Sequence, residues 1–155
     1  DKKVPLITAD SEKIRQVMLN MIDNAIYYSN PHKKVIISLK NSNGAIEFTV
    51  KDSGIGVPKS EQANLFGKFF RGTNARKKRP DGTGVGLFLA RKVILSHDGE
   101  MIFESEEGKG SIFGFKLPVH SRNKLSIPET TIIKTTTTSP AVPMVRMSFF
   151  RSKNH

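Results

Sequence analysis

Three glycines alternate with other residues in the segment DGTGVGLFLAR, residues 81–91. The residues that follow the last glycine are mostly apolar, as in the first turns of a buried helix. A helix N-terminus presents unpaired N–H groups and a partial positive charge, so glycines there let an anion, most often a phosphate, approach the backbone. A dinucleotide-binding fingerprint needs a glycine where Leu87 stands, and a P-loop needs Gly-Lys-Ser/Thr, which the segment lacks. The segment therefore predicts a phosphate site of another class, with a flexible turn before an ordinary helix as the alternative.

Two asparagines interrupt the apolar stripe of a predicted helix. Asn20 and Asn24 are four residues apart and therefore share one helix face. Two side-chain carbonyls at this spacing can hold a hydrated Mg²⁺, a cation that keeps several waters and takes further oxygens from substrate phosphates. The alternative is that neighbouring backbone groups satisfy both amides.

An acidic residue follows a predicted strand in KDSGIGVP, residues 51–58. A carboxylate at Asp52 can accept a hydrogen bond from an exocyclic amino group, which would distinguish adenine from guanine, and the two glycines after it let a flat ring pack on the backbone. The segment predicts an adenine pocket, although Asp-Ser-Gly by itself is also a common turn.

The composition limits the kind of protein that can carry these residues. The chain has 155 residues, 37% of them hydrophobic, which suits one globular domain with a tail. It has no cysteine, and no apolar run reaches the ~20 residues needed to cross a bilayer. The net charge of +11 is concentrated in residues 71–81 and after Pro118, where basic side chains attract phosphates of any kind, nucleic acid included.

Hydrophobic periodicity predicts the elements that position these residues. We expect a strand at residues 4–8, a helix from Asp10 or Ser11 to about Ser29, a short helix from Pro58 to Phe66 and a long helix from Gly84 to His97.

Alternating apolar residues predict two hairpins, one from strands 34–40 and 45–52 around Asn43-Gly44 and one from strands 100–106 and 110–118. Together these elements predict an α+β fold, a two-layer α/β sandwich with helices on one face of a mixed, mostly antiparallel sheet. The domain should span residues 1–118, because residues 119–155 are rich in Thr, Ser and Pro and predict a flexible basic tail.

Four stretches in this order, NMIDNAIYYS, DSGIGV, LFGKFFRG and GTGVGL, resemble the N, G1, F and G2 boxes of the ATP-binding catalytic domain of sensor histidine kinases. That domain is one branch of the wider gyrase, chaperone and MutL-like (GHKL) ATPase superfamily. The similarity runs from about Ile7 to Pro118. It implies the Bergerat fold, with ATP and Mg²⁺ between the helices and beneath a mobile lid.

The resemblance also implies roles for individual residues. Asn24 would coordinate Mg²⁺ with help from Asn20, and both would act with Arg71 in catalysis. Tyr28 would stack on or flank adenine, and Asp52 would bind its amino group. The remaining nucleotide-binding set is Gly54 and Gly56 at adenine, Phe66 and Phe69 at the entry to the lid, Arg71, Arg76 and Lys77 near the phosphates, and Gly82, Thr83, Gly84, Val85, Gly86 and Leu87 in the phosphate loop.

Asn20 also favours one reaction over another. In the hydrolases and serine kinases of the superfamily this position usually holds a glutamate that activates water or a hydroxyl, and an amide cannot act as that base. A neutral histidine nitrogen is already nucleophilic, so Asn20 suits phosphoryl transfer to histidine. The alternatives are a GHKL ATPase, an anti-sigma-factor-like serine kinase, or a degenerate module that senses nucleotides or binds nucleic acid.

The phosphate acceptor is expected outside this chain. His97 lies in SHDGEM, but the family's acceptor box continues with Leu, Lys or Arg, Thr and Pro, which Asp98-Gly99 replaces. The resemblance therefore implies an upstream dimerisation domain that carries the histidine, a response regulator as partner, and a homodimeric parent. It implies a cytoplasmic domain of a membrane-bound parent protein, with the membrane attachment outside this chain, and no nucleic-acid partner.

Two positions depart from the family pattern. Tyr27 stands where the family often has a lysine that helps with phosphate, so we expect that charge to come from the lid or to go unreplaced. Ile112 is assigned to the position where a threonine commonly supports the adenine-binding aspartate through water, which predicts reduced affinity for adenine.

Overall fold

The computed structural model describes residues 7–119. Its elements, in chain order, are α1 (Ser11–Tyr28), β1 (Ile36–Ser42), β2 (Ala45–Lys51), the 3₁₀ helix η1 (Lys59–Asn64), α2 (Thr73–Lys78), α3 (Gly86–Leu95), β3 (Glu100–Glu106) and β4 (Gly110–Pro118).

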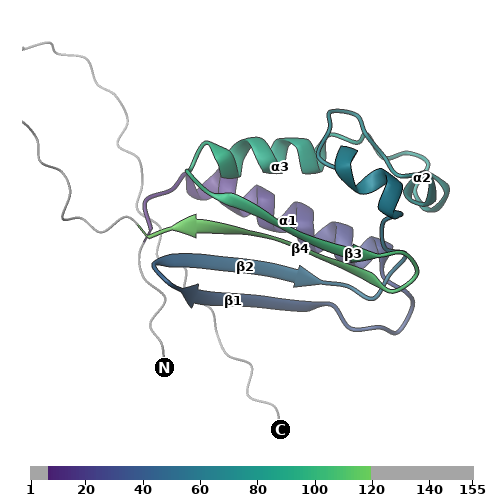
Figure 1. The fold of residues 1–155 in the computed structure, drawn as a ribbon, viewed down its shortest axis with the longest axis horizontal. Helices are drawn as coiled ribbons and strands as arrows, with labels where there is room; N and C mark the ends of the chain where they lie inside the picture. The colour runs from purple at the N-terminus through teal and green to yellow at the C-terminus, as the bar shows by residue number, and fades with distance from the viewer. Residues whose placement is uncertain (1–6, 120–155) are drawn as a thin grey trace, which may run out of the picture.

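The strands form one sheet in the order β1-β2-β4-β3, and every neighbouring pair of these strands is antiparallel. β4 therefore lies inside the sheet although it is the last strand in the sequence (Figure 1). Cross-strand pairs such as Phe48 with Phe115 and Val50 with Phe113 put large apolar side chains on one face. This confirms the predicted α/β sandwich with a mostly antiparallel sheet.

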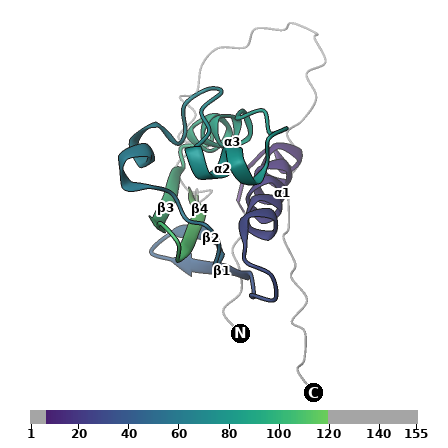
Figure 2. The ribbon, with the colours of Figure 1, turned by 90° about the vertical axis from the view of Figure 1, so that its right-hand side faces the viewer.

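α1 and α3 pack on each other and cover the same face of the sheet (Figure 2). α1 buries Ile14, Val17, Met21 and Ala25, which recur at helical spacing, against the apolar side chains of β2 and β4. Asp10 caps its N-terminus, because the Asp10 carboxylate accepts a hydrogen bond from the Lys13 N–H at 3.1 Å. This layer fixes the direction in which the asparagines of α1 point.

The predicted turn at Asn43-Gly44 is confirmed, and two helices are shorter than predicted. The short helix expected from Pro58 to Phe66 is the 3₁₀ helix η1, Lys59–Asn64. Asn43 and Gly44 both have positive φ, as a tight two-residue hairpin turn requires. α3 begins at Gly86 rather than Gly84, because φ at Gly84 is +69° and a right-handed helix excludes that value. It ends at Leu95 rather than His97.

Two further segments differ from the prediction. α2 was not predicted at all, because its six residues, TNARKK, carry no apolar periodicity. Most of the predicted strand at residues 4–8 lies outside the described residues; within the described part Ile7 is buried in the core but belongs to none of the named strands.

Candidate functional site

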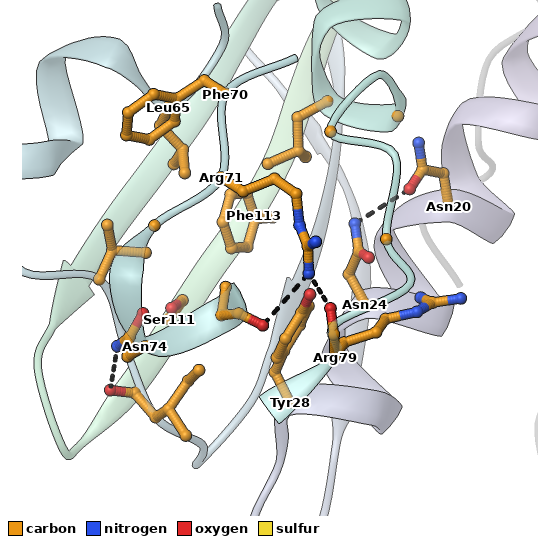
Figure 3. Close-up of a pocket in the computed structure, with 18 of the residues that line it drawn as sticks. Asn20, Asn24, Tyr28, Leu65, Phe70, Arg71, Asn74, Arg79, Ser111 and Phe113 are labelled. Atoms are coloured by element: carbon orange, nitrogen blue, oxygen red, sulfur yellow. Dashed lines mark hydrogen bonds between the residues drawn. The ribbon is translucent and has the colours of Figure 1, made fainter. Parts of the chain in front are cut away.

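A cavity of about 270 Å³ opens between α1, the start of α3, the ends of β2 and β4, and residues 65–84, which we call the lid. Figure 3 shows side chains from all of these elements pointing into the same space. The four sequence stretches singled out above meet here, although residues 30–81 separate the first from the last. The cavity is therefore the candidate functional site.

Asp52 lies at the floor of this cavity because it continues the alternation of β2. Ile46, Phe48 and Val50 are buried on the helix-covered face, and Asp52 is the next residue in that series, with 5% of its surface exposed. Its Oδ1 accepts hydrogen bonds from the backbone N–H groups of Gly54, at 2.8 Å, and Ser111, at 3.3 Å. Oδ2 has no donor among the described residues and is left for a ligand.

Ser111, and not Ile112, is the β4 residue next to this carboxylate. Ser111 is buried, lines the cavity and shares a hydroxyl–hydroxyl contact of 2.9 Å with Ser105. Ile112 is absent from the cavity lining, because neighbouring residues of a strand point to opposite faces of the sheet. The prediction that Ile112 occupies the position whose hydroxyl supports Asp52 was therefore wrong. The prediction of reduced affinity for adenine depended on it and no longer has a basis.

Backbone contacts fix the loop after Asp52. Gly54 forms an isolated antiparallel bridge with Ser29 at the end of α1, and a side chain at Gly54 would overlap the Tyr28 carbonyl. Gly56 has a φ of +61°, and a side chain there would overlap the backbone of Glu106. Both glycines are therefore required by close approach of backbone, which keeps the cavity floor flat.

The two asparagines of α1 share a hydrogen bond, as their spacing allows. Nδ2 of Asn24 donates to Oδ1 of Asn20 at 2.9 Å, and both residues line the cavity. This orientation leaves Oδ1 of Asn24 without a protein donor among the described residues. Gly86, the first residue of α3, packs directly on the Asn20 amide, so a larger residue at position 86 would displace it.

The lid is held across the cavity by bonds at several points. The carboxylate of Glu61 accepts from the Thr73 N–H at 3.1–3.2 Å and so caps α2, whose own N-cap residue is a glycine. Asn74 donates to the Gly56 carbonyl at 2.9 Å and ties α2 to the loop after Asp52. These bonds come from residues far apart in sequence, so they hold the two sides of the cavity together.

Arg71 organises the lid from within. Its guanidinium donates to the carbonyl of Pro80 at 3.0 Å. It also donates to the carbonyls of Ala75, at 3.4 Å, and Arg79 (Figure 3). Arg71 lines the cavity as predicted, but its Nη1 and Nη2 groups are already bonded to lid backbone.

The structure brings most of the predicted site residues together. Those that line the cavity are Asn20, Asn24, Tyr28, Asp52, Gly56, Arg71, Gly82, Thr83, Gly84, Gly86 and Leu87. Those that do not are Gly54, Phe66, Phe69, Arg76, Lys77 and Val85.

The predicted residues outside the lining have other contacts. Phe66 packs edge-on against Phe103, with ring centroids 6.0 Å apart. Phe69 is 63% exposed, and Arg76 and Lys77 are exposed on α2. The consecutive cations of the six-residue helix α2 point in different directions, so the sequence alone could not show which of them faces the cavity.

Several residues that line the cavity were missed, among them Ser111, Asn74 and Arg79. Ser111 could have been found by counting alternate positions along the paired strands from Asp52. Asn74 and Arg79 could not have been found from the sequence, because their positions depend on how α2 packs against α1.

Burial raises the pKa of Asp52 above its ordinary value, although the N–H groups of Gly54 and Ser111 act in the opposite direction. The folded protein then binds this proton more tightly than the unfolded chain does. Relative to an Asp52→Asn variant, the wild type should gain stability as pH falls through the raised pKa and lose that gain as pH rises. Urea denaturation of both proteins from acidic to neutral pH measures this, and a difference that stays constant with pH would contradict it.

Residues 9–121 match the family model described as "Histidine kinase-, DNA gyrase B-, and HSP90-like ATPase". The match covers the cavity and every element around it. The chain belongs to this ATPase family.

Within this ATPase family, the curated relatives are sensor kinases. The chain is 38% identical over 118 residues to the adaptive-response sensory kinase SasA of Synechococcus sp. JA-3-3Ab, and 37% identical over 114 residues to the sensor histidine kinase WalK of Bacillus subtilis. These alignments cover 76% and 72% of this chain but only 31% and 19% of the relatives. The chain thus spans about a third or less of the length of these kinases.

Solved structures of the same kind share the fold. The mycobacterial sensor histidine kinase MprB matches with a TM-score of 0.66 and 29% identity, covering 72% of this chain and 76% of that one. Full-length ShkA in complex with AMPPNP matches with a TM-score of 0.63 and 28% identity, covering 74% of this chain and 23% of that one. The fold is therefore that of histidine kinase catalytic domains. Within residues 7–119, no helix is both long and apolar enough to cross a membrane.

Proposed function

We propose that this chain is the ATP-binding catalytic domain of a two-component sensor histidine kinase, which transfers the γ-phosphoryl group of ATP to a histidine on an upstream dimerisation domain. The observation that carries the proposal is that Asp52, the asparagine pair of α1 and the glycine loop before α3 all line one cavity. Family membership and the kinase relatives support it.

The adenine end of the substrate lies at Asp52. Its Oδ1 is occupied by backbone donors, so Oδ2 accepts from the exocyclic amino group of adenine. Tyr28 and Gly56 border the same space. A guanine base presents a carbonyl oxygen at that edge, which a carboxylate repels.

The phosphate end lies at the glycine loop. Gly82, Gly84 and Gly86 lead into the N-terminus of α3, whose first N–H groups and partial positive charge favour phosphate. Thr83, Val85 and Leu87 complete the loop and the first turn. Asp52 and the loop line the same cavity, so one nucleotide can contact both.

The residues fit Mg²⁺ held mainly by substrate oxygens. Within the described residues no group of three or more His, Cys, Asp or Glu side chains could hold a metal. Asn24 offers a free amide oxygen to the cavity, and its bond to Asn20 orients that oxygen. The metal would neutralise charge on the phosphates.

The cavity lacks the base that hydrolysis of ATP needs. Among the described residues, its lining contains no Glu and no His, and its two carboxylates are Asp52, assigned to adenine, and Asp81, an exposed lid residue. An incoming neutral histidine needs no such base, so the chemistry consists of positioning and charge neutralisation. His97 is not the acceptor, because its Nε2 accepts from the Asp10 N–H at 3.0 Å and its Nδ1 lies 2.7 Å from the Val93 carbonyl oxygen.

The rest of the proposal concerns the parent protein. Residues 1–118 form the catalytic domain, and the tail expected at residues 119–155 lies, apart from Val119, outside the described residues. The parent is a homodimer that passes the phosphoryl group from its own histidine to a response regulator. This domain works in the cytoplasm, any membrane attachment lies elsewhere in the parent, and nucleic acid is not a partner.

Calorimetric titration of AMP-PNP into the chain, with and without Mg²⁺, tests the proposal. The wild type should bind more tightly with Mg²⁺, and Asn24→Ala should lose about tenfold in affinity in the presence of Mg²⁺ and little without it. Asn41→Ala, at an exposed position on β1, is the matched control and should bind like the wild type.

A folded wild-type chain that binds no analogue would overturn the proposal. Appreciable hydrolysis of ATP by the chain alone would favour the ATPase alternative. Salt-sensitive binding to DNA or RNA without any preference for adenine would favour a nucleic-acid module.

A further inference from the structure

The lid carries six cations, and one of them, Lys68, is exposed and does not line the cavity. The other five lie between Arg71 and Arg79, and their bonds differ. Arg71 donates to three lid carbonyls, and Arg76 donates through Nε to the Arg71 carbonyl at 3.0 Å. Lys78 donates through Nζ to the carbonyls of Tyr28, at 2.8 Å, and Ser29, at 2.9 Å. These three side chains serve the backbone of the lid and of α1.

The other two cations are Lys77 and Arg79. Lys77 is exposed and does not line the cavity. Arg79 does line it, and its guanidinium donates to no carbonyl among the described residues. Its one ion pair is a long contact of 3.9 Å with Asp81, whose side chain is 83% exposed, and such a pair is weak in water. Arg79 is the lid cation that remains available to a ligand.

Tyr27 fixes the place of Arg79. The guanidinium carbon lies 4.7 Å from the centroid of the Tyr27 ring, and the Tyr27 hydroxyl donates to the Lys78 carbonyl at 3.3 Å. Tyr27 is in the last turn of α1, three residues after Asn24, and is itself outside the cavity lining. Its two contacts therefore hold the end of α2 against the helix that carries the asparagine pair.

We propose that Arg79 is the lid residue that contacts the phosphates of the nucleotide and that Tyr27 is the positioning residue that holds it there. The inference rests on the proposed function and adds to it the source of the phosphate-binding charge. A guanidinium can bond two phosphate oxygens at once, and stacking on a ring leaves its N–H edge free for those bonds. Holding the lid before the ligand arrives also lowers the entropic cost of binding.

The first experiment compares ligands with and without phosphates on the 155-residue chain. Arg79→Gln should weaken binding of Mg²⁺–AMP-PNP by about tenfold or more, the effect of losing a charge-assisted bond. Its affinity for adenosine, followed by NMR, should stay close to that of the wild type. Arg91→Gln, the same change at an exposed position of α3, is the matched control and should leave both affinities unchanged.

The second experiment isolates the role of Tyr27. Tyr27→Leu should weaken AMP-PNP binding roughly threefold to fivefold, whereas Tyr27→Phe, which keeps the ring, should retain most of the affinity. In the double variant with Arg79→Gln, Tyr27→Leu should add no further loss, because it acts through Arg79. Without nucleotide, trypsin should cut after Lys77 and Lys78 faster in Tyr27→Leu than in Tyr27→Phe.

The outcomes separate this inference from the proposed function. If the wild type binds AMP-PNP and Arg79→Gln binds it equally well, the inference fails and the function stands. If Arg79→Gln is weakened but Tyr27→Leu is not, the positioning role fails. If the folded wild type binds no nucleotide, the proposed function and the inference fall together.

Discussion

An Asp52→Asn variant is expected to bind ATP about tenfold or more weakly than the wild type while staying folded. The asparagine Oδ1 keeps the hydrogen bonds from Gly54 and Ser111, so the loop keeps its shape. The second position changes from an acceptor to an N–H donor, which faces the amino group of adenine and leaves both donors unpaired. Calorimetry with AMP-PNP measures the loss.

The same variant should lose its discrimination against guanine. Its side-chain amide can donate to the carbonyl oxygen of guanine, so the affinity for GTP should rise while the affinity for ATP falls. The ratio of ATP affinity to GTP affinity should therefore fall further than the ATP affinity does. The circular dichroism spectrum and the urea midpoint at neutral pH establish that the fold is retained. Unchanged ATP affinity in a folded Asp52→Asn protein would remove Asp52 from the proposed adenine site.

Gly54→Ala should lower the free energy of unfolding by at least about 3 kcal/mol, because the added methyl group would overlap the backbone carbonyl of Tyr28 and neither backbone can move without breaking other bonds. That carbonyl also accepts from Ile55 N–H at 3.3 Å and from Lys78. Separating the two segments should therefore weaken nucleotide binding as well. Urea denaturation and AMP-PNP titration measure the two effects.

Gly44→Ala is the control for this change. Gly44 has a φ of +79° and open space where a side chain would be, so alanine there costs only about 1–2 kcal/mol of backbone strain. It lies in the β1–β2 turn, at the opposite end of β2 from Asp52 and the cavity. If Gly54→Ala and Gly44→Ala lowered the free energy of unfolding equally, the close contact between Gly54 and the Tyr28 carbonyl would not be the cause of the loss in Gly54→Ala.

Local signals were sufficient for the sheet, the two long helices and much of the site. Asn43-Gly44 and the alternation on either side specify a hairpin through neighbouring residues alone, and the 3.6-residue period of α1 places Asn20 and Asn24 on one face. Asp52 could be placed because a strand leads directly into it. These predictions succeeded where each residue is positioned by its own element.

The lid could not be predicted in the same way, because its bonds join residues far apart in sequence. Glu61 caps α2 from another helix, and Lys78 reaches the carbonyls that end α1. Five cations within nine residues look alike as a sequence, and only the folded backbone separates those that bind carbonyls from Arg79. The error at Ile112 has a related cause, since a shift of one residue along a strand reverses the face to which a side chain points.

The sheet order β1-β2-β4-β3 also affects how the protein is made. During synthesis β1 and β2 can pair early, but β3 has no neighbour until residues 110–118 leave the ribosome and enter between it and β2. The backbone donor of Ser111, which holds the Asp52 carboxylate, arrives in that same strand. A nascent chain that ends before β4 therefore has neither a closed sheet nor a nucleotide pocket, and both form together once the last strand is inserted.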